Sequence, residues 1–457
     1  MFKLYRSQGW FSRTIGFMER CVKQPIFNCS MCGQCIIRTC QLHCPMRCPK
    51  SLRNGPCGGS HEGLCEVIPG HRCVWDQVWN TAERRDQIER VMKIQPPIDW
   101  RLEGTPAWLN VVKGIITLDG HPKDGWMPQP AAPATEPRAG TTLENALRAG
   151  QFVVTAEIVP PRVPDFGSLQ KRIAALRGKV QAVNVTDNAS ASVKMPSWTV
   201  CAVLAQNGVE PIFQLACRDR NRLALQADLL GAYAFGVRNV FAVTGDFVTI
   251  GDHPGAKPVH DIDAIQLTSM LHRMRAEGKL ASGVDIRDSA KAEPFKPKLF
   301  IGCAAHPTAD PILGQVMRVL KKVRAGADFV QTQVVFDLKR FAEFMKIARD
   351  HGLTEKAKIL VGVMPMKSAK AYEFLGKVPG IKVAPEFPKR LEAAASKDEE
   401  GIAIAQEIIE FSRATPGVAG VHLMAPHWEA AIPVLLERCK LGVQPVAPPA
   451  PQPAAVV

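Results

Sequence analysis

The stretch FVVTAEIVPPR, residues 152–162, is a short run of apolar and β-branched residues that ends in a carboxylate and two prolines. Such runs are typical of strands that are buried on both faces, as in a parallel sheet. Seven similar runs follow along the chain. We therefore expect eight strands, at 152–158, 180–185, 210–215, 238–243, 298–303, 328–334, 358–363 and 418–423.

Amphipathic segments lie between these runs, for example 220–234, 262–277, 310–325 and 337–350. Each is long enough to cross back over a sheet, which a parallel connection requires. Eight βα repeats over roughly 300 residues predict a (βα)8 TIM barrel, in the α/β class.

The chain of 457 residues is longer than one hydrophobic core usually serves, so we expect more than one domain. Residues 127–140 are rich in Pro and Ala and lack periodicity, which indicates a linker. We predict a cysteine-rich domain at 1–126, this linker, the barrel at 141–442, and a disordered Pro-rich tail at 443–457.

Ten of the fourteen cysteines lie between Cys21 and Cys73, many of them two to four residues apart. Closely spaced thiolates can turn back onto one metal centre, and the Cys-Pro steps resemble those of bacterial iron-sulfur proteins. The candidate ligands are Cys29, Cys32, Cys35, Cys44, Cys48, Cys57, Cys65 and Cys73. A 4Fe-4S site would use more of these thiols than a structural zinc site, but spacing alone leaves both metals open.

A secreted disulfide framework is a third interpretation of these cysteines, and it requires an apolar signal sequence. Residues 1–23 carry five Lys or Arg among scattered aromatics instead. We expect a short amphipathic helix there, docked on the protein, and a cytoplasmic location.

The net charge of +14 is partly local, because residues 1–60 hold nine Lys or Arg against the single acid Glu19. A basic surface can attract an acidic electron carrier or an anionic substrate. Without a recognised reading element it is weak evidence for nucleic acid, so a metal-clustered nucleic-acid-binding module on a barrel scaffold is the minor alternative.

The expected strands end in polar residues, at the barrel end where active sites gather. A carboxylate there needs solvation or hydrogen bonds, which makes Glu157 and Asp246 the strongest functional candidates. His306 follows another strand, and Gln333 and His422 lie near the ends of two more. Asp187 fits helix capping and ligand contact equally well.

At these residues the chain resembles the methylenetetrahydrofolate reductase family of flavoprotein (βα)8 barrels. The motifs that carry the resemblance are TAEIVPPR at 155–162, VNVTDNASA at 183–191, AVTGD at 242–246, IGCAAHP at 301–307, AGADFVQTQVVFD at 325–337 and GVHLMAP at 420–426. CPMRCPK at 44–50, NGPCGG at 54–59 and CEVIPGHRCVW at 65–75 resemble the cysteine-rich metal-binding module that accompanies some bacterial members.

The resemblance implies an oxidoreductase acting on CH-NH donors, which interconverts 5,10-methylenetetrahydrofolate and 5-methyltetrahydrofolate with a flavin, FAD or FMN. It assigns Glu157 as general acid, Asp246 to catalysis and substrate, and Gln333 to folate binding. The implied flavin contacts are Thr186, Asn188, Gly245, Asp246 and His306. His306 stands where better-known members carry a tyrosine.

The resemblance leaves the electron donor open between NAD(P)H and reduced ferredoxin, with a relay through the cysteine-rich domain in the second case. The same site could run oxidatively on methyltetrahydrofolate in methyl-group catabolism. We expect a tetrahydrofolate substrate and an acidic electron carrier as partners, leave a homo-oligomer open, and expect neither nucleic acid nor a membrane.

Overall fold

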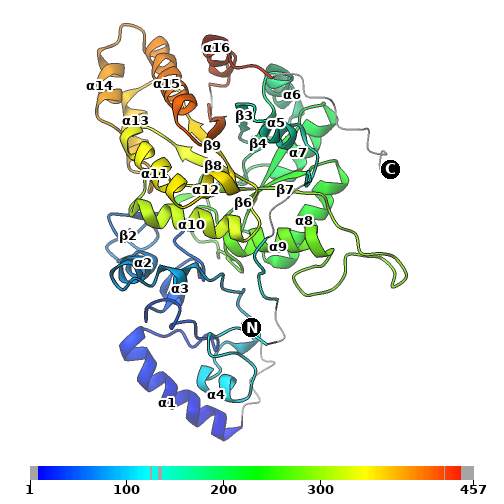
Figure 1. The fold of residues 1–457 in the computed structure, drawn as a ribbon, viewed down its shortest axis with the longest axis vertical. Helices are drawn as coiled ribbons and strands as arrows, with labels where there is room; N and C mark the ends of the chain where they lie inside the picture. The colour runs from blue at the N-terminus through cyan, green and yellow to red at the C-terminus, as the bar shows by residue number, and fades with distance from the viewer. Residues whose placement is uncertain (1–8, 124–125, 132–135, 427, 444–457) are drawn as a thin grey trace.

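The computed structural model describes residues 9–123, 126–131, 136–426 and 428–443 of the chain. An amino-terminal lobe with little regular structure lies at one end of the molecule, and a barrel forms the other (Figure 1). The predicted tail at 444–457 lies outside the described residues. Within the described part, no helix is both long and apolar enough to span a membrane.

The lobe combines one 18-residue helix, α1, with several short helices, a small hairpin and long loops. Its elements are α1 Trp10–Phe27, η2 Pro45–Arg47, the hairpin of β1 Ser60–His61 and β2 Leu64–Cys65, α2 Val74–Arg84, α3 Ile88–Met92, η3 Trp100–Leu102 and α4 Ala107–Val112. The expected helix near the amino end is α1, which begins and ends later in the chain than 1–23.

The eight predicted strands form a closed, all-parallel barrel in the order β10-β3-β4-β5-β6-β7-β8-β9. Their bounds are β3 Val153–Ile158, β4 Ala182–Val185, β5 Pro211–Ala216, β6 Asn239–Val243, β7 Phe300–Ala305, β8 Phe329–Val334, β9 Lys358–Val363 and β10 Val418–Leu423. The (βα)8 prediction is confirmed.

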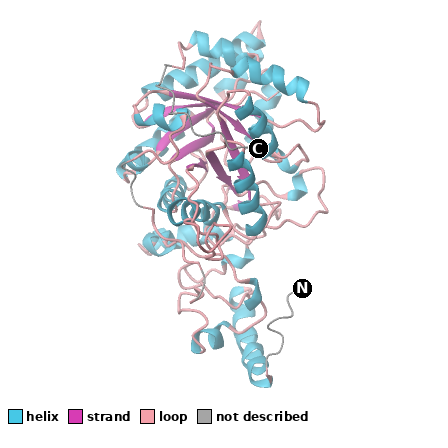
Figure 2. Ribbon diagram, turned by 90° about the vertical axis from the view of Figure 1, so that its right-hand side faces the viewer, coloured by secondary structure: helices cyan, strands magenta, loops and turns pink. Residues whose placement is uncertain are grey.

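Helices surround the barrel (Figure 2). They are α5 Thr142–Arg148, α6 Phe166–Leu176, α7 Ser197–Gln206, α8 Arg222–Ala234, α9 Ala264–Glu277, α10 Ile312–Arg324, α11 Leu338–Asp350, α12 Leu353–Lys356, α13 Ala369–Gly376, α14 Glu386–Ala393, α15 Lys397–Ala414 and α16 Ala431–Arg438, with the short turns η4 Ala189–Ala191 and η5 Val248–Ile250.

Aromatic side chains fill part of the barrel interior. Phe300 stacks on Phe329 with ring centroids 4.9 Å apart, and Phe241 packs beside them. Gly302 makes this packing fit, because a Cβ atom there would lie 2.3 Å from the Phe329 ring. A larger residue would force the rings apart in a close-packed core.

The lobe and the barrel share buried polar contacts. Asp263 caps α9 with one carboxylate oxygen and accepts hydrogen bonds from the backbone and side chain of Asn54 with the other. On the same side, Asp261 pairs with Arg222 and accepts from the indole of Trp100. Buried carboxylates satisfied in this way tie the two regions together.

The segment predicted to be a linker packs on the barrel in its described part. Arg138 forms an ion pair with Asp328 at 2.7 Å, and the Glu144 carboxylate accepts hydrogen bonds from three backbone amides, at 138–140. Ala131 donates its amide to Arg324 on α10. The domain boundaries themselves stay a prediction.

Candidate functional site

Polar side chains gather at the carboxyl end of the barrel because all eight strands run in the same direction. Glu157 is the penultimate residue of β3, Gln333 of β8 and His422 of β10. Asp246 follows β6 and His306 follows β7 directly. The structure therefore brings the residues predicted from separate motifs to one end of the barrel.

Glu157 belongs to a chain of polar contacts that crosses the barrel. Its carboxylate lies 3.6 Å from Nε2 of His422. On its other side the His422 ring contacts the Thr155 hydroxyl at 2.9 Å, and the Gln331 amide donates to that hydroxyl at 3.2 Å. Asn184 in turn donates to Gln331. These partners are all buried, so they fix the imidazole opposite the carboxylate.

Asp246 is an exposed residue whose carboxylate and backbone carbonyl are both hydrogen-bonded. Its carboxylate accepts a hydrogen bond from the amide of Ser190 at 3.0 Å, while its carbonyl accepts from the Arg218 guanidinium. Arg218 also donates to the carbonyl of Asn188 and pairs with Asp219. This buried arginine clamps the loops after β4 and β6 to each other.

Two features beside this clamp fit a flavin. The Thr186 hydroxyl is buried and has no hydrogen-bond partner among the described residues. A bound group that offers a donor or acceptor would satisfy it. Gly245 has φ +89°, a conformation that favours glycine, and a Cβ there would lie 3.0 Å from the Cβ of Arg218, so glycine keeps this loop close to the clamp.

Asn188, predicted to contact the flavin, donates its amide to Asp219 and accepts from the amide of Lys194, in a backbone conformation of φ 47°. Gln333, predicted to bind folate, turns its amide oxygen back to the amide of Val334, beside an irregularity in the β8–β9 pairing. Neither is hydrogen-bonded to Glu157 or Asp246 among the described residues.

His306 faces the lobe. Its Nδ1 lies 3.2 Å from the Arg318 guanidinium, and Gly58 of the lobe packs so closely that a Cβ there would lie 2.6 Å from the ring. Burial lowers the pKa of His306, and the positive charges of Arg318 and Lys322 lower it further. The imidazole therefore forms part of the joint between lobe and barrel.

Asp187 is neither a helix cap nor an open ligand contact. Its carboxylate accepts from the amide of Ala216 and pairs with the Arg220 guanidinium, which also binds Asp228. Burial raises the pKa of Asp187, although Arg220 opposes that shift. Its contacts within the described chain are structural.

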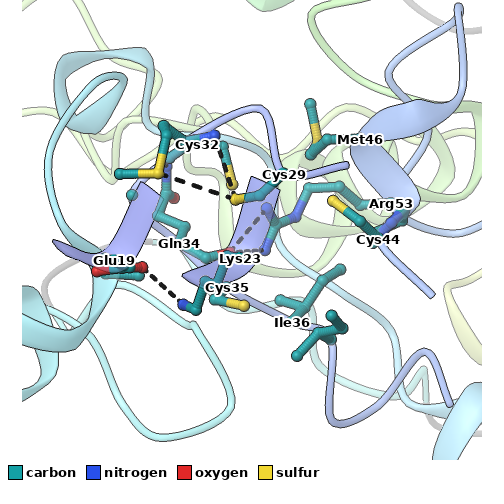
Figure 3. Close-up of a pocket in the computed structure, with 15 residues that line it drawn as sticks. Glu19, Lys23, Cys29, Cys32, Gln34, Cys35, Ile36, Cys44, Met46 and Arg53 are labelled. Atoms are coloured by element: carbon teal, nitrogen blue, oxygen red, sulfur yellow. Dashed lines mark hydrogen bonds and ion pairs between the residues drawn. The ribbon is translucent and has the colours of Figure 1, made fainter. Parts of the chain in front are cut away.

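The candidate metal ligands separate into two groups of four. The first group, Cys29, Cys32, Cys35 and Cys44, lines one small pocket with Glu19, Lys23 and Arg53 (Figure 3). Burial raises the pKa of Cys44 to about 12, and the other three thiols raise it too. We call these four residues the outer thiol group.

The second group comprises Cys48, Cys57, Cys65 and Cys73, the inner thiol group. Burial raises the pKa of Cys48, and the charges of Cys57 and Cys73 raise it further. Cys73 is affected in the same way by Cys57 and Cys65, and its pKa lies at about 12. These effects place Cys57 near both Cys48 and Cys73, and Cys65 near Cys73.

All fourteen cysteines are free thiols. Among the residues that the structure describes, no three or more Cys, His, Asp or Glu side chains are placed closely enough to hold a single metal ion. Four thiols a group nevertheless match the ligand number and type of a 4Fe-4S cluster or a four-cysteine zinc site. The donor sets match such a group in number and type, and both the presence of a metal and its identity stay predictions.

The inner thiol group adjoins the candidate active site. Lys50, two residues after Cys48, reaches from the lobe to the carbonyl of Gly245 at 3.1 Å and pairs with Glu66 at 2.5 Å. Arg318 on α10 donates to the carbonyl of Cys57 as well as approaching His306. These contacts connect the inner thiol group to the loops after β6 and β7.

Sequence reasoning missed Lys50 and Arg318 as contributors to this region and did not assign a role to His422. His422 carried a signal, since it is a polar residue in the last apolar strand. Lys50 and Arg318 carried no such signal in the sequence, because their partners, Gly245 and Cys57, lie 195 and 261 residues away along the chain.

Comparison with known proteins gives two family matches. Residues 142–440 match the methylenetetrahydrofolate reductase family, and residues 11–101 match a family described as the methylene-tetrahydrofolate reductase C terminal. In this chain that second module precedes the barrel.

Individual relatives are distant. Methylenetetrahydrofolate reductase 1 of Schizosaccharomyces pombe is 24% identical over 304 residues, 64% of this chain and 46% of its own length. The 5,10-methylenetetrahydrofolate reductase of Pectobacterium carotovorum is also 24% identical, over 57% of this chain and 82% of its own. The chain spans less than half the length of the fungal and animal relatives it matches.

A solved protein from Clostridium thermocellum, described as binding two copies of 5-methyl-5,6,7,8-tetrahydrofolic acid, is 14% identical and has a TM-score of 0.44 over 66% of this chain and all of its own. That similarity is too weak to indicate a shared ligand. The first family match, in contrast, covers the whole barrel with all eight strands and the residues at their ends. The chain therefore belongs to the methylenetetrahydrofolate reductase family.

Proposed function

We propose that this chain interconverts 5,10-methylenetetrahydrofolate and 5-methyltetrahydrofolate with a bound flavin. The observation that carries the proposal is Glu157, whose carboxylate stands at the carboxyl end of the barrel opposite a fixed His422. The family match supports the substrate class.

In the reductive direction Glu157 donates a proton to the nitrogen that leaves the methylene bridge, which opens the five-membered ring. The flavin, when bound, supplies the hydride that completes the methyl group. Thr186 and the Gly245 backbone would hold the cofactor, and the exposed Asp246 carboxylate would accept hydrogen bonds from the amino and amide groups of the pterin. Gln333 offers a donor and an acceptor to the same ring.

Glu157→Gln tests the assignment. The amide cannot donate an acidic proton, so folate turnover should fall by about 10²- to 10⁴-fold, the usual contribution of a general acid. Flavin reduction by the electron donor should stay close to wild type, as should both half-reactions of a control variant at an exposed glutamate, Glu293→Gln. Survival of folate turnover in Glu157→Gln would remove Glu157 from this role.

The two thiol groups supply the second part of the proposal. Each holds a metal centre, with a 4Fe-4S cluster as the first candidate and zinc as the alternative. The contacts of Lys50 and Arg318 support a relay in which the inner thiol group passes electrons to the flavin. A zinc-bearing lobe would instead act as scaffold, with NAD(P)H reducing the flavin directly.

Anaerobic purification with metal analysis and electron paramagnetic resonance separates these alternatives. Two clusters predict about eight irons a chain. Cys32→Ser in the outer thiol group and Cys73→Ser in the inner thiol group should each remove about half of the iron. Each variant should also lose a different part of the electron paramagnetic resonance spectrum. Zinc without iron would refute the relay and leave the folate chemistry standing.

A further inference from the structure

The helix α1 presents an apolar surface to solvent. Six of its large apolar side chains are exposed, and at 3.6 residues per turn they spread over about half of the helix circumference. The exposed fractions are 80% for Trp10, 55% for Phe11, 69% for Phe17, 52% for Met18, 47% for Val22 and 67% for Ile26. We call these six residues the α1 stripe.

The face of α1 beside the stripe holds the helix to the lobe through polar residues. Ser12, Glu19 and Lys23 are its buried residues. Glu19 pairs with Lys23 at 2.6 Å and accepts a hydrogen bond from the amide of Trp108. The expected helix docks on the protein, but with its polar face inward, so the side chains of the α1 stripe stay about half to four-fifths exposed.

An exposed apolar surface of this kind marks an interaction site, because it costs free energy until a partner covers it. The position of the buried face of the same helix indicates which class of partner would fit. Glu19 and Lys23 line the pocket of the outer thiol group (Figure 3). A protein seated on the α1 stripe would be separated from these thiols by about one helix diameter, roughly 10 Å.

The charges around the stripe favour an acidic partner. Arg13 and Arg20 are exposed on α1, and the only acid of the helix, Glu19, is buried and paired. A partner with an apolar patch and a carboxylate rim would therefore complement this surface, and its charge would speed association.

We infer that the α1 stripe is the docking site of an acidic iron-sulfur electron carrier, which delivers electrons to the outer thiol group. This inference rests on the proposed relay. Each docked carrier is oxidised by one electron and a centre in the lobe is reduced by one. Two successive encounters reduce one flavin, with protons taken from solvent.

The test uses the metal- and flavin-loaded full chain and a reduced acidic ferredoxin with two 4Fe-4S clusters as the probe. Phe17→Glu places a carboxylate in the stripe. It should weaken ferredoxin binding at least tenfold, measured by calorimetry, and slow ferredoxin-driven flavin reduction by a similar factor. Arg13→Glu should lower the association rate and its dependence on salt.

The matched control is Phe374→Glu on α13, since Phe374 is 68% exposed and Phe17 is 69% exposed. This variant should bind ferredoxin like wild type. Iron content and flavin reduction by dithionite should be unchanged in both variants, which shows that the folded, loaded protein is intact.

Four results would overturn the inference. Wild-type protein that does not bind ferredoxin, or Phe17→Glu protein that binds it as wild type does, removes the docking site. Binding of wild type, but not Phe17→Glu, to phosphatidylglycerol vesicles in place of ferredoxin would make the stripe a lipid-binding surface. Self-association abolished by Phe17→Glu would make it a contact between two copies. A wild-type chain without iron would instead refute the proposed relay, and the reason to expect an electron carrier would then be lost.

Discussion

Replacing Lys50 by methionine should loosen the contact between the inner thiol group and the barrel. Lys50 is 3% exposed, and its ammonium group joins Glu66 of the lobe to the carbonyl of Gly245, next to Asp246. Burial by itself would lower the pKa of Lys50, but the charges of Cys57 and Glu66 raise it above its ordinary value. The side chain is therefore a buried cation that needs its partners.

The expected loss of stability follows from these contacts. Removing one partner of a buried ion pair costs about 3–5 kcal/mol, and we take about 3 because the Glu66 side chain keeps 22% exposure. The unsatisfied Gly245 carbonyl adds about 1 kcal/mol. With an unfolding entropy of roughly 2.1 cal/mol/K per residue over 457 residues, about 4 kcal/mol lowers the Tm by about 4 °C.

Differential scanning calorimetry under anaerobic conditions measures this change. The double variant Lys50→Met/Glu66→Gln should recover about half of the loss, because no unpaired carboxylate remains buried. Lys279→Met is the control, since Lys279 forms its 2.7 Å pair with Asp285 at 39% exposure and should cost less than about 1 °C. A Lys50→Met shift as small as the control, or a double variant whose loss equals the sum of the single losses, would refute the reasoning.

Three further predictions concern single residues of the site. Asp246→Ala should raise the KM for methylenetetrahydrofolate by roughly 10- to 100-fold, the loss of about 1.5–3 kcal/mol in charge-assisted hydrogen bonds, and an unchanged KM in steady-state assays would contradict its contact with substrate. His422→Asn should lower kcat by about tenfold and change its pH profile with little effect on KM, because His422 faces Glu157 at 3.6 Å; a profile identical to wild type would exclude this positioning role. His260→Phe should reduce acid sensitivity: burial, Lys50 and Arg218 lower the pKa of His260 to about 3, so below its ordinary value of 6.5 only the unfolded chain takes up the proton and stability falls as the pH drops. The contribution of this histidine is a loss of roughly 3 kcal/mol at pH 4. Thermal melts between pH 7 and 4 should show stability falling more steeply in wild type than in the variant, and equal slopes would contradict the prediction.

The strands could be predicted closely because their signal is local. The run at 358–363 was predicted with the bounds that β9 has, and the run at 418–423 with those of β10. Buried parallel strands are almost continuously apolar, and glycines and amphipathic helices punctuate them, so the pattern of one segment identifies it without knowledge of its neighbours. The remaining strand ends shifted by no more than two residues.

The amino-terminal lobe was harder to predict for the opposite reason. It has little periodic structure, and its buried residues include the charged Arg53, Lys50 and Glu19, which are stable inside only because specific partners surround them. The amphipathic pattern of α1 predicted a docked helix, yet its polar face is the one that is buried. Pattern alone cannot say which face a helix buries when a pocket supplies polar partners.

The sequence by itself determined the barrel, the family to which the chain belongs, and the polar residues that end the strands, since each depends on residues adjacent in the chain. Only the tertiary structure decided that eight thiols separate into an outer and an inner group, that Lys50 and Arg318 join the inner group to the loops after β6 and β7, and that His422 faces Glu157. These relations join residues up to 265 positions apart, as Glu157 and His422 are. Closing the barrel brings β3 beside β10 and the lobe against the strand ends, and no local pattern encodes that contact.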